Sequence, residues 1–199
     1  MILLIIWING AFGAGKTTTC FELSRRLPNS FVYDPENVGY FIRKNVPKSI
    51  LKGDFQDHTI WREMNYSMLQ TICNDYDGII IVPMTIVNPK YFDEIITKLR
   101  SNGVEVKHFA LLASRETLLK RLRSRGDHKN SWPARQIDRC MASLSQELFE
   151  QHIQTDNLTT EQIIELIAEA CNIELQPDHR SAVKKKIDRW MNQLKHIRI

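Results

Sequence analysis

Residues 10–17 read GAFGAGKT and fit the phosphate-binding pattern G-x-x-x-x-G-K-[ST], known as Walker A. The apolar run ILLIIWI at residues 2–8 precedes the loop, and a helical pattern from Gly15 to about Leu27 follows it. A strand, a glycine-rich turn and a helix together aim backbone N–H groups and a helix N-terminus at phosphate. This stretch therefore predicts an α/β fold that binds a nucleoside triphosphate.

The parts of this loop have separate predicted roles. The glycines allow the backbone to curl, Lys16 reaches the β- and γ-phosphates, and the hydroxyl of Thr17 is offered to Mg²⁺. An accidental glycine-rich turn is the alternative, and the buried strand before the loop disfavours it. The predicted nucleotide-binding residues of the loop are Gly10, Ala11, Phe12, Gly13, Ala14, Gly15, Lys16, Thr17 and Thr18.

Outside the loop, apolar runs rich in Ile and Val alternate with segments whose apolar residues recur at helical spacing. This alternation predicts a three-layer domain, with a mostly parallel five-stranded sheet covered by helices on both faces. We assign residues 1–180 to this domain and 181–199 to a C-terminal amphipathic helix. The predicted strands are 2–8, 31–33, 78–87, 104–114 and 152–156, and the predicted helices are 15–27, 59–74, 89–103, 115–125, 133–149 and 159–171.

The 199 residues carry a net charge of +4, and the charge is unevenly distributed. Residues 115–139 and 182–199 each carry +5, so the remainder of the chain carries −6. Such a composition excludes collagen-like, disordered and disulfide-rich classes. The four cysteines are widely spaced, which disfavours zinc and disulfides, and no apolar run reaches membrane-spanning length. We expect a cytoplasmic protein.

The sequence offers few acids to organise the phosphate chemistry. It lacks the N-K-x-D motif of GTPase switches, and the strand at 78–87 contains Met84 and Thr85 where motor ATPases usually carry an acid. Asp34 and Glu36, which follow the strand at 31–33, are the nearest candidates. In open α/β sheets such a position faces the ligand crevice. Asp34 is predicted either to take a proton from an acceptor hydroxyl or to form the turn before Pro35.

Two arginine pairs suggest a lid over the phosphates. Arg121 and Arg125 share one helical face, and Arg135 and Arg139 repeat the spacing after a polar loop. Arginine-bearing helices that close over ATP would neutralise charge on the transferring phosphoryl group. A solvated surface helix is the alternative for each pair.

The acceptor side is expected between the second and third strands, where residues 55–65 read FQDHTIWREMN. Trp61 could stack on a substrate and Arg62 could anchor an anionic group. A core Trp beside an exposed Arg is an equally good reading. Thr85 joins Asp34 and Glu36 as a predicted substrate contact.

Several segments together resemble the bacterial tunicamycin-resistance ATP-binding proteins. They are WINGAFGAGKT, VYDPENVGY, GDFQDHTIWR, IIIVPMTIV, LLASRETLLKRLRSR, KNSWPARQIDRC and HIQTDNL, and they span essentially the whole chain. The resemblance implies a P-loop kinase-like fold, binding of ATP with Mg²⁺, and resistance to the lipophilic nucleoside antibiotic tunicamycin. The family is also similar to chloramphenicol phosphotransferases and shikimate-type kinases. Phosphorylation of the drug and ATP-dependent sequestration both remain open.

The tail beyond Pro177 predicts a basic amphipathic helix. Val183, Ile187, Leu194 and Ile197 recur at helical spacing, while lysines lie toward the other side. Such a helix can lie at the inner membrane surface or dock on the domain. Nucleic acid is not an expected partner, because the aromatic and glycine-loop features of an RNA module are absent.

Overall fold

The computed structural model describes residues 4–149, 151–185, 187–188 and 191. Its centre is a five-stranded sheet with the order β2-β3-β1-β4-β5, in which every pairing is parallel. The predicted fold class is therefore confirmed. The strands are β1 (Leu4–Gly10), β2 (Ser30–Val32), β3 (Ile79–Pro83), β4 (Glu105–Leu112) and β5 (His152–Gln154).

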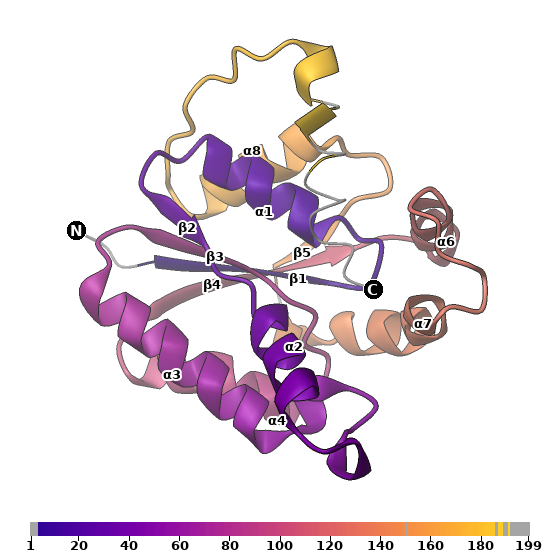
Figure 1. The fold of residues 1–199 in the computed structure, drawn as a ribbon. Helices are drawn as coiled ribbons and strands as arrows, with labels where there is room; N and C mark the ends of the chain where they lie inside the picture. Colours follow the sequence, from indigo (N-terminus) through magenta and orange to yellow (C-terminus); the bar gives the residue numbers. More distant parts are fainter. Residues whose placement is uncertain (1–3, 150, 186, 189–190, 192–199) are drawn as a thin grey trace.

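Helices cover both faces of this sheet (Figure 1). The helices α1 and α8 pack on one face, α3 and the α4–α5 region cover the other, and α6 and α7 lie toward the carboxyl ends of the strands. The helices are α1 (Lys16–Arg25), α2 (Glu36–Asn45), α3 (Thr59–Asp75), α4 (Pro89–Phe92), α5 (Lys98–Ser101), α6 (Arg115–Arg123), α7 (Trp132–Leu144) and α8 (Thr160–Ala170). A π-helical segment, Asp93–Thr97, joins α4 to α5, and 3₁₀ turns occur at Lys48–Ile50, Phe55–Asp57 and Glu147–Phe149.

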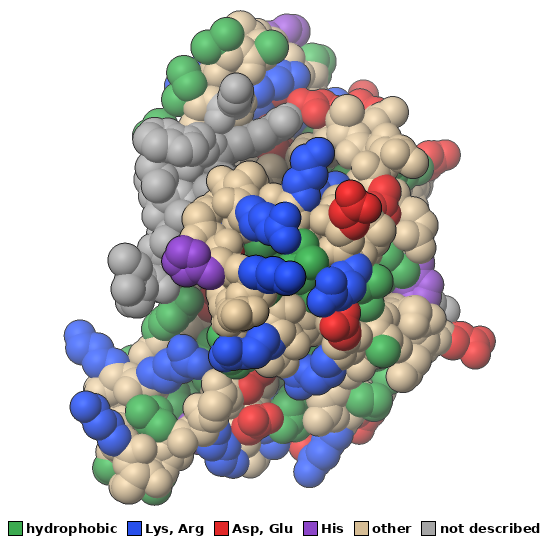
Figure 2. Space-filling model, turned by 90° about the vertical axis from the view of Figure 1, so that its right-hand side faces the viewer, with side chains coloured by type: hydrophobic (Ala, Val, Ile, Leu, Met, Phe, Trp, Pro, Cys, Tyr) green, Lys and Arg blue, Asp and Glu red, His purple; other side chains and the backbone are tan. Residues whose placement is uncertain are grey.

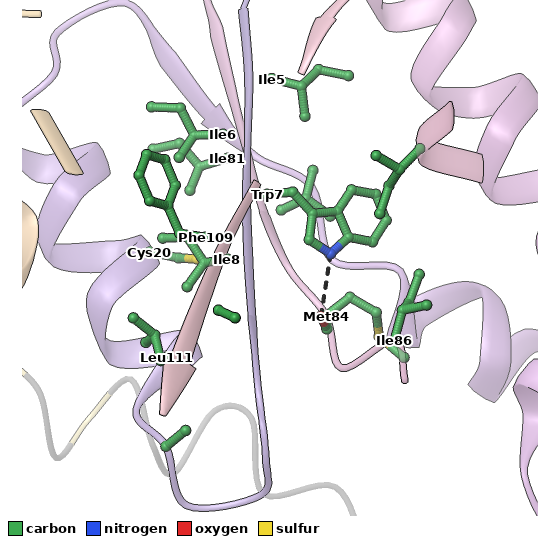
Figure 3. Close-up of a cluster of buried hydrophobic side chains, with 14 of the residues drawn as sticks. Ile5, Ile6, Trp7, Ile8, Cys20, Ile81, Met84, Ile86, Phe109 and Leu111 are labelled. Carbon is green, nitrogen blue, oxygen red and sulfur yellow. Dashed lines mark hydrogen bonds between the residues drawn. The ribbon is translucent and has the colours of Figure 1, made fainter. Parts of the chain in front are cut away.

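The strand β1 is buried along its whole length, as a central strand of a parallel sheet must be. Side chains from both of its faces enter the hydrophobic core (Figure 3). Trp7 is fully buried, and its indole Nε1 donates to the carbonyl of Met84 at 3.3 Å. A rigid central strand thus fixes the start of the phosphate loop.

The strand β3 is shorter than the predicted 78–87, because the chain leaves the sheet after Pro83. Beyond this point, the side chain of buried Asn9 makes the hydrogen bonds to Ile86 that a neighbouring strand would otherwise make. Its Oδ1 accepts the Ile86 N–H at 3.0 Å, and its Nδ2 donates to the Ile86 carbonyl at 2.7 Å. One side chain therefore holds residues 84–87 against the end of β1, which places Thr85 beside the phosphate loop.

Two further elements differ from the predicted ones. The helix predicted to reach residue 149 ends at Leu144, after which Phe149 turns into the core against the ring of Phe92 at 5.3 Å. The helix α2 was not predicted. Gly39 in α2 lies so close to Phe55 that a Cβ would come within 2.5 Å of the ring, which allows α2 to pack against residues 55–57.

The tail is held to the domain by a cluster of ion pairs. Arg180 contacts Glu22 of α1 and Asp178, and its Nη1 donates to Asp188 at 2.8 Å. Residues 182–185 are helical, but much of the predicted 181–199 helix lies outside the described residues. Among the described residues, no helix has the length and apolarity needed to cross a bilayer.

Candidate functional site

The phosphate loop forms an open cradle of backbone at the start of α1. Gly13 has a φ of +85°, and a Cβ there would lie 2.9 Å from the Leu118 carbonyl oxygen. Gly15, with a φ of +102°, is the N-cap of α1 and faces open space. No side chain caps α1 and its first turn has no acid, although first-turn N–H groups need an acceptor. A phosphate fits these donors.

Lys16 is folded back over the loop. Its Nζ donates to the carbonyls of Gly10 at 3.0 Å and Ala11 at 3.2 Å, and it lies 5.5 Å from the centre of the Phe12 ring. Burial lowers the pKa of Lys16 to about 8, and the nearby carboxylate of Glu36 opposes that shift. The ammonium group is therefore held in a place where an added anion would stabilise its charge.

A cavity of about 590 Å³ opens in front of this cradle. It lies between the loop, the segment after β2, the turn before α3 and the connection between α6 and α7. The lining residues are Phe12, Gly13, Lys16, Thr17, Thr18, Asp34, Glu36, Tyr40, Arg43, Gly53, Asp54, Phe55, Gln56, Pro83, Met84, Thr85, Leu122, Arg125, Gly126, Asp127, Trp132 and Pro133. The structure thus brings the predicted phosphate loop, Asp34, Glu36, Thr85 and Arg125 to one space.

Asp34 forms the turn that the sequence predicted before α2 and also lines the cavity. Its Oδ1 accepts the backbone N–H of Glu36 at 3.0 Å, so it shapes the turn into α2. It also lines the cavity, together with Lys16 and Thr17. Glu36 lines the same wall and accepts from the Tyr40 hydroxyl at 3.4 Å. Both residues therefore line the same cavity as the phosphate loop.

Thr85 and Gln56 connect the two walls of the cavity. The Thr85 Oγ1 donates to the Gly10 carbonyl at 2.7 Å, and the Thr85 carbonyl accepts from the Gln56 Nε2 at 3.0 Å. The acceptor-side turn is thereby tied to the phosphate loop. Sequence reasoning missed Gln56, because one glutamine in a loop carries no spacing signal.

Trp61 and Arg62 support the cavity from behind and do not line it. Trp61 is fully buried, and its Nε1 donates to the Pro35 carbonyl at 3.1 Å. Arg62 is 5% exposed, forms an ion pair with Glu94 and donates to the Gln56 carbonyl at 2.6 Å. Their predicted substrate contacts would require exposed atoms, and the structure gives these residues a supporting position instead.

The two arginines predicted to share one helical face are separated by the end of α6. The helix stops at Arg123, and Gly126, with a φ of +92°, turns the chain. Arg125 then lines the cavity. Arg121 points elsewhere, donating to the Thr155 carbonyl at 2.9 Å and weakly to the Ala14 carbonyl at 3.4 Å. Arg121 therefore braces the loop against the segment after β5.

The second arginine pair lies outside the cavity wall. Arg135 is exposed and donates to the Asn130 carbonyl at 2.9 Å. Arg139 lies 3.9 Å from the carboxylate of Asp54, which lines the cavity. Burial raises the pKa of Asp54, while Arg139 acts in the other direction. Figure 2 shows Lys and Arg side chains gathered over the end of the molecule that carries α6 and α7.

Aromatic residues that were not predicted as site residues also line the cavity. The ring of Trp132, at the start of α7, contacts that of Phe12 edge-on with 5.1 Å between centres. Tyr40 and Phe55 stand on the acceptor side, with 6.4 Å between their rings. The position of Trp132 at the N-terminus of a predicted lid helix could have indicated its contact with the phosphate loop.

Comparison with known proteins places this architecture in a family. Residues 5–148 match the model of a family described as an AAA domain. The tunicamycin resistance protein of Deinococcus radiodurans is 36% identical, with a TM-score of 0.76, over 87% of this chain and 98% of that one. The chain belongs to the tunicamycin-resistance protein family. The resemblance inferred from sequence motifs is therefore confirmed.

More distant structures share the fold of this tunicamycin-resistance family member. A sugar kinase from Janibacter sp. HTCC2649 is 18% identical with a TM-score of 0.60, covering 87% of this chain and 96% of that one. A shikimate kinase from Bacteroides thetaiotaomicron is 17% identical with a TM-score of 0.54, covering 85% and 99%. Comparison with curated protein sequences gives no match. The kinase structures therefore support the P-loop kinase-like fold alone.

Proposed function

We propose that this protein is a cytoplasmic ATP-dependent phosphotransferase that modifies a hydroxyl of tunicamycin or a related nucleoside and so confers resistance. One observation carries the proposal. A single cavity joins the phosphate loop at Lys16 and Thr17 to Asp34 and to a second wall at Asp54 and Phe55. A site for nucleotide alone would not need that second wall. The family member from D. radiodurans, a tunicamycin resistance protein, suggests the acceptor.

Different residues of the cavity have different roles in the proposed phosphoryl transfer. Backbone N–H groups from Gly13 to Thr18 and the Lys16 ammonium would hold the phosphates, and the Thr17 hydroxyl would be a ligand of Mg²⁺. Bound Mg·ATP supplies the phosphoryl group and neutralises part of its negative charge. Asp34 accepts the proton of the acceptor hydroxyl. Arg125 adds positive charge beside the phosphates.

One observation favours the second candidate, ATP-dependent sequestration without chemical change. At the end of β3, Thr85 stands where an acid would be expected, and its hydroxyl is committed to the Gly10 carbonyl. Among the described residues, no group of three His, Cys, Asp or Glu side chains could hold a metal ion. The ligands of Mg²⁺ would then be Thr17, phosphate oxygens and water. Asp34 and Glu36 are the carboxylates that line the same cavity.

A direct assay decides between these two functions. Purified protein incubated with Mg·ATP and tunicamycin is expected to add one phosphoryl group to the drug, which mass spectrometry detects. An unchanged drug mass, under conditions where binding of both ligands is measured, would reject phosphotransfer and leave sequestration. Lys16→Ala protein serves as the control for contaminating kinases.

The pKa of Lys16 predicts how ATP binding depends on pH. Burial holds that pKa at about 8 in the free protein, so the ammonium loses its proton as pH rises through 8. ATP favours the charged form, so binding takes up a proton above this pH. We expect ATP affinity to be about tenfold weaker at about pH 9 than at about pH 7. Isothermal titration at several pH values tests this expectation.

A Lys16→Arg variant is the control for that titration, because arginine stays charged throughout this range. Its ATP affinity should change little between the same two pH values. A parent affinity that is flat with pH, or an equally steep dependence in Lys16→Arg, would contradict the assignment to Lys16.

A further inference from the structure

Residues 41–52 form a protruding segment that we call the basic lobe. It comprises the second half of α2 and the 3₁₀ turn Lys48–Ile50, and it is the lowest part of the molecule in Figure 1. Between residues 37 and 53 the chain has four basic residues and no Asp or Glu. The remainder of the chain outside the two clusters described above is acidic, so this lobe is a separate local concentration of positive charge. The four basic residues are Arg43, Lys44, Lys48 and Lys52.

Large apolar side chains share this lobe with the positive charges. Phe41 is 56% exposed, Ile50 57% and Leu51 38%. Single exposed apolar residues are ordinary on a protein surface, but three within one short basic segment are not explained by packing. In Figure 2 the lowest lobe of the molecule carries hydrophobic and basic side chains together.

Two of the four basic side chains of the lobe contact other groups of the protein. Lys52 donates to the Asp57 carbonyl at 2.7 Å, and the Arg43 guanidinium lies over the Phe55 ring at 5.3 Å. Lys44 and Lys48 form no ion pair with any residue that the structure describes. These two exposed lysines therefore carry positive charge that no carboxylate of the described residues neutralises.

We propose that the basic lobe docks on an anionic membrane surface. Lysines attract acidic lipid headgroups, and exposed apolar side chains gain by entering the interface beside them. A nucleic acid would satisfy the lysines and could stack on Phe41, but it would leave Ile50 and Leu51 in water. The combination of both kinds of side chain thus fits a lipid surface.

The position of the lobe connects this contact to the cavity. Arg43 belongs to the lobe and lines the cavity, as does Gly53 at its end. Docking through the lobe therefore brings one wall of the cavity to the membrane surface. A ligand that partitions into the bilayer would have a short path to the site.

Vesicle co-sedimentation of the full chain tests the lobe. The parent should bind vesicles of phosphatidylcholine with phosphatidylglycerol more strongly than pure phosphatidylcholine. Each lysine near an anionic surface contributes about fivefold in partitioning, so Lys44→Gln/Lys48→Gln should lower binding about 25-fold. The matched control Lys120→Gln/Lys129→Gln removes two exposed charges elsewhere and should leave binding within about twofold.

The apolar part of the lobe is tested at high ionic strength. About 1 M salt shortens the Debye length to about 3 Å and removes most of the attraction between lysines and headgroups. The binding that persists should be lost in Ile50→Ser/Leu51→Ser. Circular dichroism and ATP binding check that these exposed substitutions leave the fold unchanged.

Three outcomes would overturn the proposal. The first is that the parent binds no anionic vesicles, or that the control pair loses as much binding as the lobe pair. The second is that only Lys184→Gln/Lys185→Gln/Lys186→Gln loses binding, which would assign the contact to the tail. The third is that the lobe variant loses binding to single-stranded RNA while vesicle binding is unaffected.

Discussion

Replacing Lys16 by alanine is expected to weaken nucleotide binding by several orders of magnitude and to remove resistance. The Lys16 Nζ donates to the Gly10 and Ala11 carbonyls and stands at the mouth of the cradle formed by Gly13 and Gly15. A charge-assisted hydrogen bond is worth about 1.5–3 kcal/mol. Loss of two such bonds to phosphate would weaken ATP binding by about 10²–10⁴-fold. Isothermal titration with Mg·ATP measures the change.

A loss of binding could also arise from a damaged loop, so stability must be measured alongside it. The buried Lys16 charge is disfavoured in the free protein, as its lowered pKa shows. Lys16→Ala should therefore keep the thermal midpoint of the parent within a few degrees. Lys120→Ala, an exposed substitution on α6, provides the control. Retention of parent-like ATP affinity by Lys16→Ala would remove the phosphate loop from the proposed mechanism.

The sequence predicted the cradle well because its determinants are local. A loop between a buried strand and a helix needs only the glycine and lysine spacing at residues 10–17, and the structure realises that context. Strands β1 and β4 were equally predictable, since continuous apolar runs identify strands buried on both faces. Such features depend on neighbours in the chain and can be recognised from one sequence.

The acceptor side depends on contacts between distant residues, and sequence reasoning was weaker there. Gly39 meets Phe55 only after α2 folds against the turn before α3, so α2 was missed. The indole of Trp61 bonds to the carbonyl of Pro35, 26 residues away, which periodicity along one helix cannot reveal. A helical pattern gives the spacing of a face but not whether that face meets the core or a cavity.

The same limitation affected the arginines of the predicted lid. Arg121 and Arg125 have the spacing of one helical face, yet α6 ends between them at Arg123, and Gly126 turns the chain just after Arg125. Only Arg125 reaches the cavity, while Arg121 bonds to Thr155 across 34 residues. Gly126 was visible in the sequence as a helix breaker, but whether α6 would stop before or after Arg125 was not.

Asp34→Asn is expected to separate chemistry from binding. If Asp34 accepts the proton of the acceptor hydroxyl, the substitution should lower kcat by about 10²–10⁴-fold. Asparagine has nearly the same shape and can still accept the Glu36 N–H through its Oδ1, so the turn into α2 should persist. ATP affinity should change by less than about tenfold, because Asp34 is not among the predicted phosphate ligands. Single-turnover phosphorylation and ATP titration measure the two quantities separately.

Resistance in cells then distinguishes the two candidate functions. Under phosphotransfer, Asp34→Asn cells become sensitive to tunicamycin although the protein still binds ATP and drug. Under sequestration, the same cells stay resistant, while Lys16→Ala cells are sensitive under both. Glu36→Gln is the matched control, since Glu36 lines the same wall. If Asp34→Asn and Glu36→Gln lower kcat equally, the wall acts through its negative charge and Asp34 is not the specific proton acceptor.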